Sequence, residues 1–235
     1  MRILFDDLVR SATLSSTYES ANYPAQNLAH VFVKKRYQAT ASPDTVTIAW
    51  AADQAINCIF YGFHNVTGLV FTLKASGGST LKTVTVSDPD EYGAEYFSVV
   101  SGVRSVSIAV TGAAGMYVGK VSMGEYYQAP DPDDGFDEPL TDNTSVVRSP
   151  GGQTLATRSV PLLGLSVVFS GKARSEWVEF RDLYRSISKG ATIWVDFSED
   201  DHSFMAPLYC AFNDAPKREK LAGQYSWTAE LMESR

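Results

Sequence analysis

The stretch Asp44-Thr-Val-Thr-Ile-Ala-Trp50 shows the pattern that recurs through the first half of the chain. Its apolar side chains Val46, Ile48 and Trp50 fall at every second position, between two threonines and an alanine. An apolar period of two is typical of a strand that buries one face. The stretch therefore predicts a β-strand in an antiparallel sheet.

Similar short segments follow along the chain, separated by turn signals such as Gly77-Gly78 and Asp88-Pro89. They span 56–62, 69–76, 82–87, 96–100, 103–110 and 116–123. Strands at a spacing of about 8–12 residues are typical of a sandwich. The first half is therefore predicted to be an antiparallel β-sandwich, whereas Asn22–Leu28 is expected to be a loop with one turn.

The second half of the chain shows a different order of elements. Ser149-Pro-Gly-Gly152 predicts a hairpin with a long return strand, in which Pro161 marks a bulge or an edge. One helix is predicted at 173–188, followed by strands at 192–197, 207–212 and 225–231. This order predicts an α+β domain, so that the whole chain is mainly β.

The helix prediction rests on a single apolar stripe. The stripe consists of Trp177, Phe180, Leu183, Tyr184 and Ile187. This spacing matches one face of an α-helix. Ser175 is the expected N-cap, and Lys189-Gly190 the expected end.

The acidic stretch between Gln128 and Pro139 divides the two halves. It reads Gln128-Ala-Pro-Asp-Pro-Asp-Asp-Gly-Phe-Asp-Glu-Pro139. Its prolines limit backbone freedom, as in a semi-rigid spacer. We therefore predict a sandwich at 1–127, a linker at 128–141 and a second domain at 142–235.

Composition argues for protein contacts rather than polyanion binding. The 235 residues carry a formal net charge of -7, and a nucleic-acid binder needs a basic face. No segment has the roughly 20 apolar residues that a membrane helix needs. The acids Asp6 and Asp7 near the N-terminus argue against a signal peptide. Cys58 and Cys210 lie in apolar strands and are expected to be buried free thiols.

Catalytic and metal-binding patterns are weak. No nucleophile or phosphate-loop motif occurs, so we expect neither an enzyme nor a cofactor. The best metal candidate is the loop Glu199-Asp-Asp-His202, but consecutive residues cannot all point at one ion, and a solvated loop is the favoured interpretation. The acidic linker lacks the spacing of a calcium loop. Five aromatic residues could instead form a sugar-stacking platform or serve in a core or interface: Tyr92, Tyr96, Phe97, Tyr126 and Tyr127.

Several motifs in the first half resemble the discoidin-like (galactose-binding-like) β-sandwich domains of phage tail proteins. They are the turn Tyr23-Pro-Ala-Gln-Asn-Leu28, the basic and aromatic segment Lys34-Lys-Arg-Tyr-Gln38, the run Ile56–Asn65 and the last strand Met116–Gly124. The resemblance covers about residues 10–127. Domains of this family often bind glycans or Ca²⁺ through loops at one end. The resemblance assigns no ligand residue, but the loop residues to test first are Tyr23, Asn27, His64 and Asn65, and a structural role in turns is the favoured interpretation for all four.

The second half resembles, in element order, the tail-tube-like fold of tube, distal-tail and hub proteins of long-tailed phages. The hairpin, the helix and the strand Tyr225–Leu231 carry this resemblance. Distal tail proteins usually have the ring-forming domain first, and here the order is reversed.

Together the two resemblances imply a non-enzymatic structural protein of a phage tail tip. It would form a homo-oligomeric ring, commonly a hexamer, and would contact tube, hub and tape-measure proteins in the virion after synthesis in the bacterial cytoplasm. The alternative is a carbohydrate-binding adhesion module that contacts host surface glycans.

Overall fold

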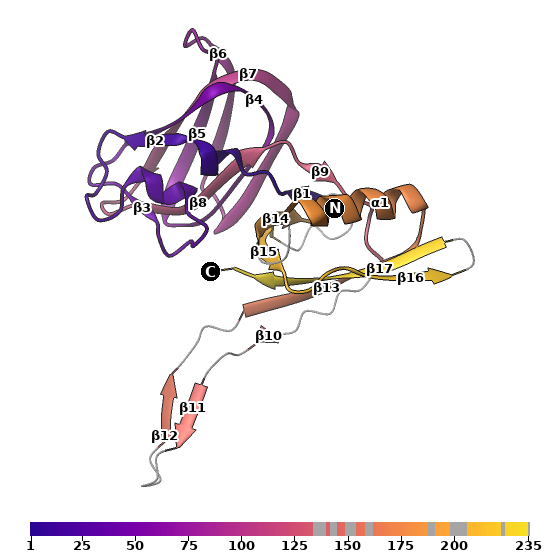
Figure 1. The fold of residues 1–235 in the computed structure, drawn as a ribbon. Coiled ribbons are helices and arrows are strands. Elements are labelled where there is room, and N and C mark those ends of the chain that lie inside the picture. The colour runs from indigo at the N-terminus through magenta and orange to yellow at the C-terminus, as the bar shows by residue number, and fades with distance from the viewer. Residues whose placement is uncertain are drawn as a thin grey trace. The chain divides into compact units, whose positions relative to one another are not determined.

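The computed structural model describes residues 1–133, 140–141, 145–148, 154–157, 162–187, 191–197, 206–221 and 224–234. The chain divides into two compact units. The first unit contains Met1–Gln128 and Ile193–Leu208, and the second contains Ala129–Thr192 and Tyr209–Ser234. As predicted, the chain is mainly β with antiparallel pairing, and the described part of the chain has one α-helix (Figure 1).

The first unit is built on one set of paired antiparallel strands. They are β2 (Thr13–Ser16), β3 (Tyr37–Gln38), β4 (Asp44–His64), β5 (Val66–Lys74), β6 (Thr80–Ser87), β7 (Tyr92–Gly112) and β8 (Tyr117–Gly124). Their order is β3-β8-β4-β7-β5-β6, with β2 also paired to β4. Two short 3-10 helices, η1 (Leu8–Ser11) and η2 (Ala25–Ala29), lie in the connections. The expected turn in Asn22–Leu28 is thus confirmed.

The strands β4 and β7 are each 21 residues long, although the sequence predicts each as two strands. The first part of β4 pairs with β2 and the end of β7, and its last part pairs with β8 and the start of β7. The register shifts several times between Ala49 and Cys58. Because bulges bend and twist a strand, each long strand serves both layers of a sandwich without a turn.

The alternation of side chains along β4 separates two buried surfaces. Ile48, Ile59 and Tyr61 point into the hydrophobic core of the sandwich and are at most 5% exposed. Phe60 is also fully buried but is not part of that core. Its ring stacks on Trp194 with ring centroids 5.3 Å apart. Neighbouring residues of β4 therefore pack on opposite faces of the same layer.

Trp194 lies in β14 (Thr192–Asp196), most of which belongs to the first unit. β14 pairs antiparallel with β1 (Arg2–Leu4), and β1 pairs with β9 (Tyr127–Gln128). The Trp194 indole Nε1 donates a hydrogen bond of 3.0 Å to Ser122 Oγ. A strand from the C-terminal part of the sequence thus covers the outer face of the layer formed by β4 and β8.

The second unit centres on β17 (Gln224–Glu233). Its other strands are β10 (Leu140–Thr141), β11 (Ser145–Arg148), β12 (Thr154–Thr157), β13 (Leu162–Lys172), β15 (Leu208–Phe212) and β16 (Lys217–Leu221). β17 pairs with β13, β15 and β16, whereas β10 pairs with β13 and β11 with β12. The charged sequence of β16, Lys-Arg-Glu-Lys-Leu, has no apolar alternation, so the sequence does not predict it.

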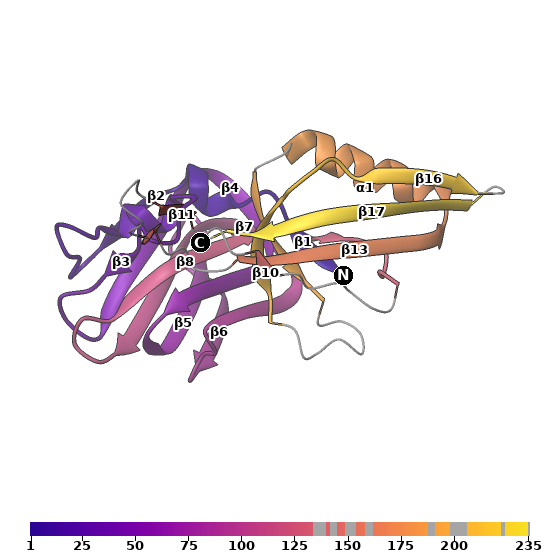
Figure 2. The ribbon, with the colours of Figure 1, turned by 90° about the horizontal axis from the view of Figure 1, so that it is seen from below.

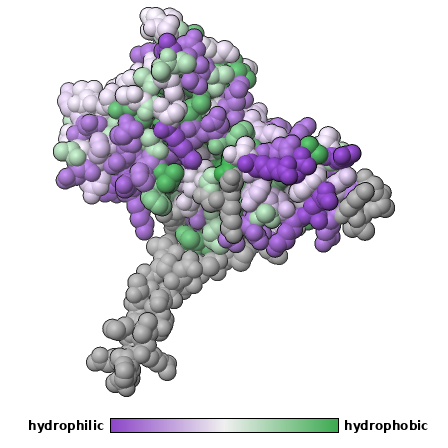
Figure 3. Space-filling model, viewed as in Figure 1, coloured by the Kyte–Doolittle hydropathy of each residue, from purple (hydrophilic) through white to green (hydrophobic). Residues whose placement is uncertain are grey.

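The helix α1 (Arg174–Ile187) packs over this sheet (Figure 2). As predicted, Trp177, Phe180 and Leu183 are buried, and the first two contact Trp227 of β17. The outward face of α1 is hydrophilic (Figure 3). The expected N-cap is wrong, because the helix begins at Arg174 and Glu176 Oε2 accepts a hydrogen bond of 2.6 Å from the Ala173 amide.

Several expectations fall outside the described residues. They are the turn at Ser149–Gly152, Pro161, the helix end at Lys189-Gly190, the loop Glu199–His202 and most of the acidic linker. Both cysteines are free and buried, as expected. In the described ranges no helix is both long enough and apolar enough to span a bilayer.

Candidate functional site

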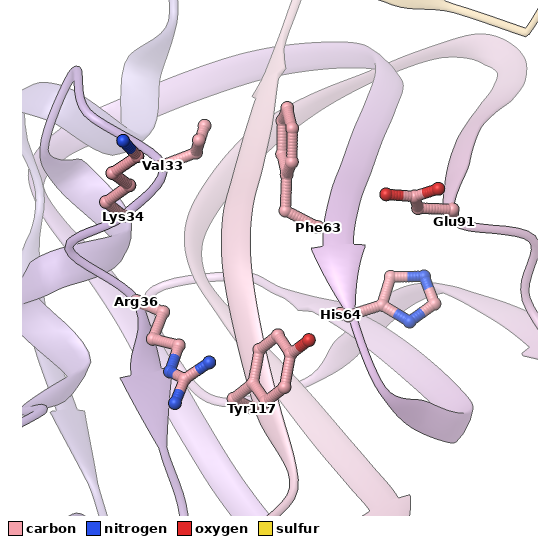
Figure 4. A pocket seen from close by; sticks show the side chains of 7 residues that line it. All are labelled: Val33, Lys34, Arg36, Phe63, His64, Glu91 and Tyr117. Atoms are coloured by element: carbon pink, nitrogen blue, oxygen red, sulfur yellow. The ribbon is translucent and has the colours of Figure 1, made fainter. Parts of the chain in front are cut away.

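A hollow of about 350 Å³ opens on the surface of the first unit, where four segments of the chain meet. One side is formed by Val33, Lys34 and Arg36, which precede β3 (Figure 4). The other lining residues are Phe63 and His64 at the end of β4, Glu91 just before β7, and Tyr117 at the start of β8. The volume is at the lower end of the range for small-molecule sites.

The backbone at the end of β4 is shaped by a close approach to β8. Phe63 has a φ of 58°, in the left-handed region that a bulky residue rarely adopts. A Cβ on Gly119 would lie 2.7 Å from the Phe63 Cβ and 2.9 Å from its carbonyl oxygen. Glycine at 119 therefore permits the turn that places Phe63 and His64 in the hollow. Strained backbone of this kind is often found at binding sites.

Arg36 lies near two aromatic rings. Its guanidinium carbon lies 4.1 Å from the centroid of the Tyr117 ring and 5.5 Å from that of Tyr23. The Asn27 side-chain amide donates a hydrogen bond of 3.0 Å to the Arg36 carbonyl. Cation–π contacts and this anchored backbone restrict the side chain to the edge of the hollow.

Burial favours the neutral form of the His64 ring. Burial lowers its pKa below the usual histidine value, and this effect outweighs the opposing influence of the Asp90 carbonyl and of Glu91. Its Nε2 lies 2.8 Å from the Asp90 carbonyl oxygen, which only accepts hydrogen bonds. We therefore assign the proton of the neutral ring to Nε2. Nδ1 is then an acceptor, and it is buried without a partner among the described residues.

The four ligand-loop candidates from the sequence gather around this hollow in different ways. His64 lines it directly. Tyr23 and Asn27 contact Arg36, through its guanidinium and its carbonyl respectively. Asn65 Oδ1 accepts a hydrogen bond of 2.7 Å from the Tyr117 amide, which joins the end of β4 to β8. Three of the four thus support lining residues, and one is itself a lining residue.

Sequence reasoning did not single out most of the lining residues as candidates. Arg36 and Tyr117 lie in segments that carry the discoidin-like resemblance, so a signal for them was present. Phe63 lies in the run Ile56–Asn65, which also carries that resemblance, whereas Glu91 carries no local signal and reaches the hollow through the pairing of β4 with β7.

Three of the five aromatic residues considered from sequence, Tyr96, Tyr126 and Phe97, contact other side chains. Arg2 covers the Tyr96 ring at 4.0 Å, and the Tyr96 hydroxyl donates a hydrogen bond of 2.5 Å to Asp196. Tyr126 meets Tyr96 edge to face, and Lys82 lies 5.2 Å from the centroid of the Phe97 ring. Each of these three rings therefore contacts a side chain of the protein itself. Within the described ranges, no cluster of three metal-ligating side chains occurs.

The sequence matches no protein-family model, and no curated protein matches it either. About half of the chain is similar in fold to solved carbohydrate-binding modules. A fucose-binding module of Streptococcus pneumoniae has 10% identity and a TM-score of 0.46, over 52% of this chain and 99% of that one. A family 32 module from Clostridium perfringens NanJ, in complex with galactose, has 13% identity and a TM-score of 0.44, over 54% of this chain and 100% of that one. A module from the same organism in complex with GalNAc-β-1,3-galactose has 12% identity and a TM-score of 0.45, over 51% and 100%. These likenesses assign no ligand residue to this chain.

Proposed function

We propose that the first unit is a discoidin-like, non-enzymatic carbohydrate-binding module whose ligand occupies the hollow beside Arg36, His64 and Tyr117. The observation that carries this proposal is the convergence of apolar and polar side chains on one open hollow. A saccharide combines apolar C–H faces with hydroxyl groups that both donate and accept hydrogen bonds.

The lining matches those requirements. Val33, Phe63 and Tyr117 supply apolar and aromatic surface. Lys34 and Arg36 supply hydrogen-bond donors, and the Glu91 carboxylate supplies acceptors. A mostly apolar concave surface with a few convergent polar groups is the usual form of a small-ligand site.

A glycan array probed with the whole chain tests this proposal. We expect binding to one class of glycan, and Tyr117→Ala should weaken it by at least about fivefold, since one aromatic contact is worth on the order of 1 kcal/mol or more. Tyr18→Ala is the matched control, because Tyr18 is 49% exposed and does not line the hollow. Absence of binding to any glycan, or equal loss in both variants, would refute the proposal.

Assembly in a phage tail tip is a second candidate function, and it concerns the second unit. It is favoured by the pair β11–β12, whose strands pair only with each other among the described strands, and by the predicted order of hairpin, helix and strands. A ring would pair such elements between copies. Light scattering during size exclusion tests this candidate: a ring-sized species, commonly a hexamer, is expected, and a strict monomer at high concentration would exclude it.

A further inference from the structure

Two cations, Lys34 and Arg36, line one side of the hollow. Arg104, Lys120 and Lys217 each lie within 4 Å of an aspartate carboxylate oxygen. Lys34 and Arg36 form no such ion pair with any residue that the structure describes. Among the described residues, no carboxylate thus pairs with the positive charge on this side of the hollow.

Arg36 contacts an aromatic ring at the hollow. Its guanidinium carbon lies 4.1 Å from the centroid of the Tyr117 ring and 5.5 Å from that of Tyr23. A guanidinium over a ring face keeps N–H groups that can donate to a ligand. A planar, pre-oriented guanidinium edge matches the two oxygens of a carboxylate.

The local charge at the hollow opposes the charge of the whole chain. The chain has a formal net charge of -7, but the hollow is lined by two cations, Lys34 and Arg36, and one anion, Glu91. In Figure 4, Glu91 comes from a different segment than the two cations and lies across the hollow from them. Glu91 can therefore accept hydrogen bonds from hydroxyls while the cations meet a negative group.

From these contacts we infer that the saccharide bound in the hollow carries a carboxylate, which Arg36 binds through its guanidinium N–H groups with support from Lys34. Glu91 accepts hydrogen bonds from hydroxyl groups of the same ligand. This inference rests on the proposed carbohydrate-binding function and specifies its ligand class.

Matched pairs of glycans that differ in one acidic group test the inference without altering the protein. The probes are 3′-sialyllactose against lactose, and trigalacturonate against its methyl ester, each titrated into the whole chain by calorimetry. We expect the acidic member of at least one pair to bind at least tenfold more tightly, and this preference to fall as salt concentration rises.

Three variants separate the role of Arg36 from general effects of charge. Arg36→Gln should abolish the preference for the acidic member, and Arg36→Lys should restore only part of it, because lysine keeps the charge but not the planar edge. Lys35→Gln is the control, since Lys35 is an exposed neighbour that does not line the hollow. Melting temperatures of all variants check that each is folded.

The outcomes distinguish the inference from the function on which it rests. Equal or tighter binding of lactose and of the methyl ester would overturn the acidic ligand but leave carbohydrate binding intact. A loss of preference as large in Lys35→Gln as in Arg36→Gln would also overturn it. No binding of any probe or array glycan would overturn both.

Discussion

The Lys120 ammonium lies 3.0 Å from the Asp7 carboxylate, and the lysine side chain is fully buried. Asp7 also caps η1 by accepting a hydrogen bond from the Val9 amide, and it accepts another from Ser122 Oγ. The Lys120 ammonium further donates to the carbonyls of Leu28 and His30. This ion pair thus joins η1, β8 and the C-terminal end of η2 inside the first unit. Burial lowers the pKa of Lys120, and the attraction of Asp7 counteracts part of that effect.

Lys120→Met is expected to lower the free energy of unfolding by about 3 kcal/mol, because it removes the buried cation of Asp7 and leaves only the partly exposed Arg10, 3.5 Å away, to balance that carboxylate. Urea unfolding of the purified chain measures this loss. Lys217→Met is the control, since the Lys217–Asp214 pair is exposed, and it should cost less than about 1 kcal/mol. Adding Asp7→Asn to Lys120→Met should recover part of the loss, and a loss no larger than that of the control would show that the buried pair is not needed.

Gly119→Ala is expected to cost about 1–3 kcal/mol, since the new Cβ would approach backbone atoms rather than flexible side chains. Those atoms are the carbonyl oxygens of Phe63 at 2.9 Å and of Val33 at 3.2 Å. Both residues line the hollow, so glycan binding should weaken together with stability. Gly77→Ala is the control, because no heavy atom lies within 4 Å of the Cβ position. Equal stability of the two variants in urea would contradict the close approach.

Because the pKa of His64 is lowered, we expect the protein to lose stability in mildly acidic solution. The pKa of this histidine in the folded chain is lower than in the unfolded chain, chiefly because of burial. Below the unfolded value of about 6.5, the unfolded chain therefore binds more protons than the folded chain, so stability falls as the pH falls from 7 towards 5. His64→Gln should show a smaller drop in melting temperature over this range. His30→Gln is the comparison, because the pKa of His30 is also lowered, by burial and then by the charges of Lys35 and Lys120, and His30 does not line the hollow. An unchanged pH dependence in His64→Gln would refute the assignment.

Trp194→Ala is expected to destabilise the first unit by about 3–5 kcal/mol, because a fully buried indole is lost. Its ring stacks on Phe60, and its N–H donates to Ser122. Trp194→Phe should lose less, since it keeps an aromatic ring against Phe60 and gives up the hydrogen bond and only part of the buried volume. Unfolding followed by tyrosine and tryptophan fluorescence measures both. If Trp194→Ala left the first unit as stable as the original chain, β14 would not be part of its packing.

The sequence by itself determined the elements whose side chains follow a regular period. The alternation of Val46, Ile48 and Trp50 predicts one strand of a sandwich, and the stripe through Trp177 and Phe180 predicts the helix, because local periodicity decides which face is buried. It also placed the turn at Asn22–Leu28 and the two buried thiols. Element boundaries were less accurate, as the N-cap of α1 shows.

Only the tertiary structure decided what depends on residues far apart in the chain. Bulges merge pairs of predicted strands into β4 and β7, and β16 forms because β17 offers it a partner despite its charged sequence. The hollow gathers Arg36, His64, Glu91 and Tyr117 from four segments, none of which specifies the others. The buried charge of Lys120 is balanced by an ion pair with Asp7. Such positions arise from pairing register and charge compensation, which no local pattern in a single sequence encodes.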